Sequence, residues 1–175
     1  MRTIQQLLLI GCLFLAFACK KPEEFPIIPT IELKEIYSER DTGNYDQDVI
    51  VVFNFTDGDG DIGYYSPETG LNDPIFDTPG GQYYNNFIVA IWRKTNGVWE
   101  KDTVAANGDP LDISARLPYL TPTGKNKALK GEIKRTLPVD AGLRNDTFRY
   151  DIFIYDRGLH SSNVVTTPEV ILRTR

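Results

Sequence analysis

The chain has 175 residues and a formal net charge of −5, from 19 basic and 24 acidic side chains. An acidic protein gains nothing from the counterion release that drives nucleic-acid binding, so we expect no nucleic-acid partner. The single histidine, His160, argues against a zinc site of several histidines and against a histidine-based catalytic triad.

Residues 1–18 have the layout of a secretory signal peptide. Arg2 gives the positive start, and the apolar run at residues 7–18 is shorter than the roughly 20 residues that a membrane-spanning helix needs. Residues 15–19, Leu-Ala-Phe-Ala-Cys, resemble a bacterial lipobox, although Ala16 stands where that motif usually has an aliphatic residue. The resemblance implies that Cys19 is diacylated and becomes the new N-terminus. The alternative is an ordinary signal peptide with an incidental cysteine.

Cys12 lies in the apolar run and would be removed with it, which leaves Cys19 as the only cysteine. We therefore expect no intramolecular disulfide, no cysteine-based metal site and no thiol nucleophile. An exported domain without disulfides must be held together by its core, by a metal ion, or by both.

Residues 19–29 read as a tether, because three prolines and mixed charges favour an extended, semi-flexible segment. The charged stretch at residues 20–24 resembles the export signal that follows the lipidated cysteine in surface lipoproteins of Bacteroidota. Two acyl chains would anchor the protein stably, whereas one chain gives only marginal membrane binding. We expect a cell-envelope protein, lipid-anchored in the outer membrane on its periplasmic or its outer face.

From residue 30 onward the apolar pattern has a period of two. Asn96-Gly97 between two such runs predicts a β-hairpin, and residues 48–56 are apolar on both faces, which predicts a central strand. No window carries a helical apolar stripe. We expect one domain, residues 30–175, folded as a single immunoglobulin-like antiparallel β-sandwich of about eight strands. The expected strands are residues 31–36, 48–56, 83–94, 98–101, 111–117, 128–137, 148–155 and 163–172.

The acidic loop, residues 57–63, has the sequence Asp-Gly-Asp-Gly-Asp-Ile-Gly. Alternating carboxylates from Asp57, Asp59 and Asp61 can converge on one centre, and glycines allow the positive φ angles of a tight wrap. Calcium prefers six to eight oxygen ligands, so we predict a calcium site with Asp156 as a further candidate ligand. The spacing matches part of an EF-hand loop, but Ile62 stands where that loop needs glycine. The alternative is a solvated turn whose aspartates cap their own backbone.

Three segments together resemble small Bacteroidota lipoproteins with an immunoglobulin-like or fibronectin-like sandwich. They are residues 55–63, the turn Tyr-Asp-Arg-Gly at residues 155–158, and residues 162–168. The function of that family is largely unknown, so the resemblance implies a fold and a cellular address, and no activity.

We expect a non-catalytic binding or structural module whose partner is an envelope protein or a glycan, with the long loop at residues 64–82 as its contact surface. A carbohydrate-binding accessory lipoprotein is the alternative, with Tyr64, Tyr65, Tyr83 and Tyr84 as ligand contacts, unless these rings only line strands. An envelope hydrolase would need a cleft with converging acids. No carboxylate pair stands out for that chemistry, so we expect no enzyme activity.

Overall fold

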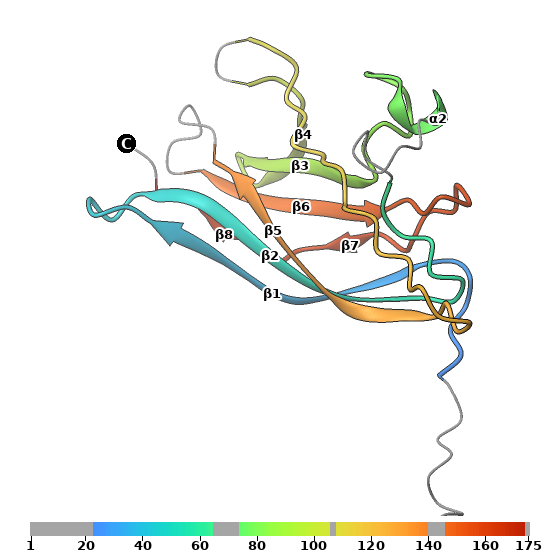
Figure 1. The fold of residues 1–175 in the computed structure, drawn as a ribbon. Helices are drawn as coiled ribbons and strands as arrows, with labels where there is room; N and C mark the ends of the chain where they lie inside the picture. The colour runs from blue at the N-terminus through green and yellow to red at the C-terminus, as the bar shows by residue number, and fades with distance from the viewer. Residues whose placement is uncertain (1–22, 65–73, 106–107, 140–145, 174–175) are drawn as a thin grey trace, which may run out of the picture.

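The computed structural model describes residues 23–64, 74–105, 108–139 and 146–173. Eight strands and one helical turn are seen within them (Figure 1). None of these ranges holds a helix long and apolar enough to cross a membrane. The elements are β1 (Thr30–Arg40), β2 (Asp46–Asp57), α2 (Pro74–Asp77), β3 (Phe87–Thr95), β4 (Val98–Asp102), β5 (Leu129–Pro138), β6 (Thr147–Ile154), β7 (Val165–Thr166) and β8 (Val170–Ile171).

Two antiparallel sheets pack face to face. The first has the order β1-β2-β5, and the second has the order β4-β3-β6-β7, with β8 also paired to β6. In an immunoglobulin-like sandwich, the first, second and fifth strands pack against the third, sixth and seventh. The two sheets here have this arrangement, and β4 extends the second sheet. The predicted antiparallel sandwich of about eight strands is confirmed.

One core fills the space between the sheets. Every second side chain along the strands of each sheet points inward and contributes to this core. The central strand β2 sends Val49, Val51 and Phe53 into it. On the other face of β2, Ile50 and Val52 are buried as well. The prediction of a central β2 is confirmed.

Strand β1 differs from its predicted alternation. A register shift between Leu33 and Glu35 inserts a bulge, so that Leu33 and Ile36 both pack against the core. The extra residue turns Glu35 to the solvent side, where its charge needs no burial. A strict period of two would have placed Glu35 on the same face as Leu33.

Turn chemistry explains where other strands begin and end. Asn96 and Gly97 both have positive φ, 51° and 82°, as a type I′ hairpin turn requires, so the predicted hairpin is confirmed. The prediction of a strand at residues 111–117 was wrong. This segment makes a single isolated bridge, between Ala115 and Phe87, and Asp112 bends it by accepting a hydrogen bond from the Ser114 amide. The predicted last strand divides into β7 and β8, separated by Pro168, which has no amide hydrogen to donate.

Four segments distant in the sequence meet at one end of the sandwich. They are the acidic loop after β2, the turn after β6, the stretch leading into β5, and residues 23–29 before β1 (Figure 1). This end contains the residues from which a candidate site can be built.

Candidate cation site at the acidic loop

Three carboxylates converge in the acidic loop. One side-chain oxygen from each of Asp57, Asp59 and Asp61 lies within 4.8 Å of the others. Asp57 ends β2 and is fully buried, Asp61 is half-buried and Asp59 is exposed. Two unit charges at this distance repel by roughly 3 to 4 kcal/mol at an effective dielectric constant of 20. A cation would convert this repulsion into attraction.

The buried carboxylate of Asp57 is only half satisfied. Its Oδ2 accepts a hydrogen bond of 2.8 Å from the Asp61 amide, whereas its Oδ1 is buried without a partner among the described residues. The Oδ1 of Asp61 is also buried without a partner among the described residues, whereas its Oδ2 accepts a hydrogen bond of 2.9 Å from the Gly158 amide. A buried, unpartnered carboxylate oxygen is costly unless a ligand completes it.

The pKa values reflect this crowding. Burial raises the pKa of Asp57 to about 6, and the negative charges of Asp61, Asp59 and Asp156 add to the rise. The pKa of Asp61 is also raised, by burial and then by the charges of Asp156 and Asp59. The environment therefore disfavours the charged form of both groups, and a bound cation would favour it.

Asp156 lies beside the cluster. An isolated antiparallel bridge joins Ile62 to Asp156, and the Asp156 side chain is fully buried. Both of its oxygens already have partners in His160. The His160 amide donates to Oδ1 at 2.8 Å, and His160 Nδ1 lies 2.9 Å from Oδ2. This contact raises the pKa of His160.

Arg157 joins the acidic loop to the stretch before β5. Its guanidinium donates to the carbonyl oxygens of Ile62 and Gly63, at 3.3 and 2.6 Å, and to the Thr121 hydroxyl. The same group lies over the Tyr119 ring, 4.5 Å from its centre. The Arg157 amide also donates to the Asp61 carbonyl. The motif at residues 155–158 and the acidic loop are therefore two halves of one structure.

Two glycines of the loop are needed for close backbone approach as well as for their φ angles. A β-carbon at Gly60 would lie 1.9 Å from the Lys127 carbonyl oxygen, and one at Gly63 would lie 1.7 Å from that of Pro118. Both residues have positive φ, 67° and 84°. Any side chain here would strain the backbone and push the neighbouring segment away.

The four candidate tyrosines do not share one exposed surface in the described chain. Tyr64 is buried, with its ring 4.2 Å from that of Phe76. Tyr83 is half-buried and meets Tyr155 edge to face, with 5.1 Å between ring centres. Tyr84 is half-buried under the guanidinium of Arg116. Tyr65 lies outside the described residues.

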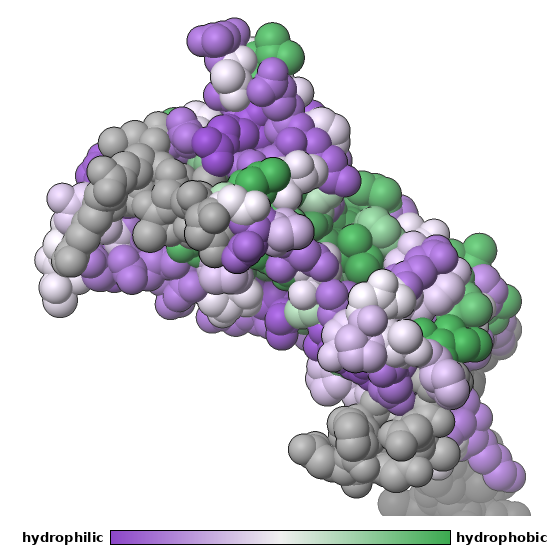
Figure 2. All heavy atoms as spheres, turned by 90° about the horizontal axis from the view of Figure 1, so that it is seen from above, coloured by the Kyte–Doolittle hydropathy of each residue, from purple (hydrophilic) through white to green (hydrophobic). Residues whose placement is uncertain are grey.

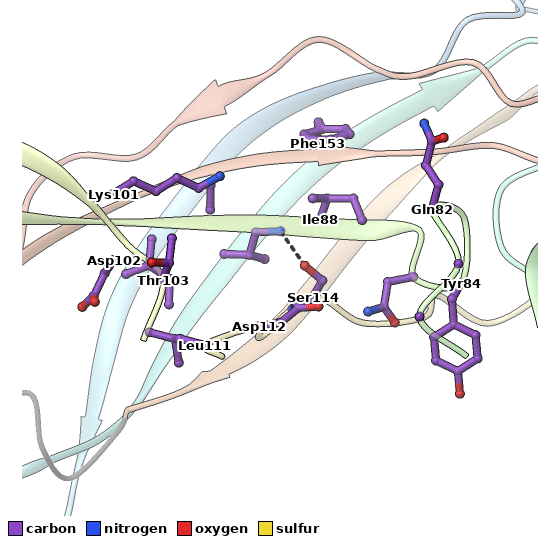
Figure 3. A pocket seen from close by; sticks show the side chains of 16 residues that line it. Gln82, Tyr84, Ile88, Lys101, Asp102, Thr103, Leu111, Asp112, Ser114 and Phe153 are labelled. Atoms are coloured by element: carbon purple, nitrogen blue, oxygen red, sulfur yellow. Dashed lines mark hydrogen bonds between the residues drawn. The ribbon is translucent and has the colours of Figure 1, made fainter. Parts of the chain in front are cut away.

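A hollow of about 720 Å³ lies beside Tyr84, along the outer edge of β3 (Figure 3). The view from above shows hydrophobic residues in green between hydrophilic residues in purple (Figure 2). The chain that flanks β3 leaves its edge after Asp102 and returns at Ala115, which opens the hollow. Ile88 and Phe153 line its apolar part, and Lys101 and Asp112 line its polar part.

The sequence reading missed three contributors to this end of the molecule. The sequence predicts no role for His160, gives Arg157 only as part of a turn motif, and places Pro26 in a semi-flexible tether. Pro26 and Arg157 contact the acidic loop through partners 32 to 96 positions away, and His160 contacts Asp156 within its own turn. No local pattern signals such contacts. Cys19, the predicted lipidation site, lies outside the described residues.

The site therefore has to be interpreted from its own geometry, because comparisons with protein-family models, with curated proteins and with solved structures find no significant match.

Proposed function

We propose that the protein is a lipid-anchored β-sandwich of the cell envelope, which acts as a non-catalytic binding or structural module stabilised by calcium at the acidic loop. The observation that carries this proposal is the fully buried Asp57, whose unpartnered Oδ1 lies in a group of three converging carboxylates. Cys19 would hold the anchor, and the sandwich would present its surface to an envelope partner.

The donor set favours calcium over other cations. All three side chains offer hard carboxylate oxygens, which calcium takes six to eight at a time in flexible geometry. Zinc prefers nitrogen and sulfur ligands, and the cluster contains neither. Magnesium demands a regular octahedron and keeps several waters, which suits a buried carboxylate less well.

Asp57, Asp59 and Asp61 are the proposed ligands, and Asp156 is the fourth candidate. Its negative charge already acts on Asp57 and Asp61. Each of its two oxygens is bonded to His160 and keeps a second lone pair. Asp156 is not among the three side chains whose oxygens converge, so it can contribute by charge from its present position or as a ligand after its side chain moves.

The test compares thermal unfolding of the metal-free protein with and without 10 mM calcium. Extracellular calcium sites have dissociation constants on the order of 10⁻⁴ to 10⁻³ M, so the expected gain is about 1.4 to 2.7 kcal/mol. The midpoint should rise by roughly 3 to 10 °C. Identical curves would refute the ion site.

Asp59→Asn is the informative variant, because Asp59 is exposed and makes no hydrogen bond with the other described residues. It should fold normally and lose most of the calcium response. Asp48→Asn is the matched control, since Asp48 is a half-buried aspartate outside the cluster. It should keep the full response.

Carbohydrate binding is a second candidate, favoured by the hollow beside Tyr84. Its apolar side chains could accept the C–H face of a sugar, and Lys101 and Asp112 could bond to hydroxyl groups. A glycan array would identify a ligand, and Lys101→Ala should then weaken binding at least tenfold. Lys125→Ala, an exposed lysine away from the hollow, should not. Equal binding by both variants would exclude this location.

A further inference from the structure

The segment that leads from the anchor to the sandwich is in contact with the acidic loop. The Gly58 amide donates a hydrogen bond of 2.8 Å to the Pro26 carbonyl. On the other side, the Lys130 amine lies 3.3 Å from the Glu23 carboxylate and 5.9 Å from the centre of the Phe25 ring. Residues 23–26 therefore lie between the acidic loop and the start of β5.

Gly58 is required by this contact alone. A β-carbon at Gly58 would lie 2.2 Å from the Phe25 carbonyl oxygen and 2.8 Å from the carbonyl carbon of Pro26, distances that real β-carbons do not adopt. Unlike Gly60 and Gly63, Gly58 does not have a positive φ. Its missing side chain makes room for the backbone of the tether.

Gly58 also connects two of the proposed ligands. Its amide belongs to the peptide bond with Asp57, and its carbonyl begins the peptide bond with Asp59. The backbone angles around Gly58 that set the relative positions of these two side chains therefore also set the direction of the Gly58 amide toward Pro26. A ligand that fixes one arrangement also fixes the other.

We infer that the acidic loop is a cation-controlled latch for the tether, in which ion binding to Asp57 and Asp59 holds Gly58 in the conformation that binds Pro26. This inference rests on the proposed cation site. With the ion bound, the orientation of the sandwich relative to residues 23–26 is fixed. Without it, residues 23–26 separate from the loop more often and the domain swings freely.

Linkage makes the latch reciprocal. If calcium strengthens the contact between tether and loop by some factor, then closing the contact strengthens calcium binding by the same factor. The two effects can be measured independently, one at the amide of Gly58 and the other in the calcium affinity.

The first measurement is hydrogen exchange of the Gly58 amide by NMR in the full chain, with 10 mM calcium or with chelator. Exchange of this amide requires its bond to Pro26 to open, so it reports the latch directly. Calcium should slow exchange at least tenfold at Gly58. It should leave within twofold those amides of the distant β3–β4 hairpin that exchange by local opening, as an internal control.

The second measurement is calcium affinity by calorimetry for Gly58→Ala and its control Gly124→Ala. The alanine methyl at position 58 displaces the tether but leaves all three carboxylates in place, so affinity should fall about tenfold. Gly124 has open space around it and an ordinary φ, so its variant should bind like the wild type. If Gly58→Ala does not fold, the exchange measurement on the wild type still decides.

The outcomes separate the two proposals. Absence of calcium binding to the wild type would overturn the ion site and the latch together. Calcium binding with unchanged exchange at Gly58 would overturn the latch alone and leave the ion site standing. Equal calcium affinity of Gly58→Ala and wild type would also refute the latch.

Discussion

Asp57 is the residue on which the candidate site depends. It ends the central strand of the first sheet, and its position there buries a carboxylate that a loop elsewhere would have left in water. An ionisable carboxylate is poorly suited to a buried position, and such conflicts between a residue and its surroundings are typical of functional sites. Without a cation this conflict should make the protein less stable than its core alone would allow.

The conflict predicts a pH dependence for the metal-free protein. The pKa of Asp57 is about 6 when folded and near 3.8 when unfolded, so the folded state binds more protons between these values. Stability must then fall as pH rises from about 4 to 6, by about 3 kcal/mol at most. The raised pKa of Asp61 acts in the same direction from pH 3.8 upward, and the raised pKa of His160 does so only above pH 6.5. Urea unfolding of metal-stripped protein between pH 4 and 7 measures this.

The matched variant is Asp57→Asn, which cannot ionise. At pH 7 it should be more stable than the wild type without calcium, by about 1 to 3 kcal/mol. It should also gain nothing from calcium. A metal-free wild type whose stability rises between pH 4 and 6, or an Asp57→Asn protein that is destabilised at pH 7, would contradict this account of Asp57.

At the scale of elements, Arg157 is the connection between the turn after β6, the acidic loop and the stretch before β5. Arg157→Lys keeps the charge but loses the planar group that donates to three acceptors at once. It should lower the free energy of unfolding by about 1 to 3 kcal/mol, measured by urea titration. The exposed Arg173, whose side chain has no partner in the described chain, gives the control Arg173→Lys, with an expected change near zero.

The glycines of the turns separate two causes of strain. Gly97 has positive φ and open space, so Gly97→Ala carries only the backbone penalty, about 1 kcal/mol. Gly63 has the same φ but also meets the Pro118 carbonyl, so Gly63→Ala should cost clearly more. Thermal unfolding of both variants in chelator gives the comparison. Equal losses would mean that the segment at Pro118 moves aside freely.

For the molecule as a whole, residues 23–26 of the tether and the proposed ion site lie at the same end of the sandwich. The tether enters where the acidic loop, the turn after β6 and the start of β5 meet (Figure 1). Calcium would therefore stiffen the end that the tether enters, while the hollow along β3 stays available to a partner.

The anchor itself is tested by Cys19→Ser. Mass spectrometry of the wild type should find an N-terminal cysteine with two acyl chains, and the protein should fractionate with membranes. The variant should be found unacylated in the soluble fraction, because two chains are needed for stable attachment. An unmodified Cys19 in the wild type would refute the anchor.

The order of residues along the chain was enough to predict the fold class, most strand positions and the hairpin at Asn96-Gly97. These follow from side-chain alternation and from turn chemistry, which act between near neighbours. It also drew attention to the acidic loop, because three carboxylates in five residues are visible without a structure. The bulge in β1 was not predicted, because one extra residue shifts the alternation of side chains without any signal in the composition.

Three features appear only in the folded chain: Asp57 is buried, Asp156 lies beside the loop with His160 as its partner, and Pro26 contacts Gly58. Each depends on which strands become neighbours, and that choice minimises the free energy of the whole core rather than of any segment. Carboxylates in a peptide are all alike in water. The fold alone makes one of them costly to leave without a cation.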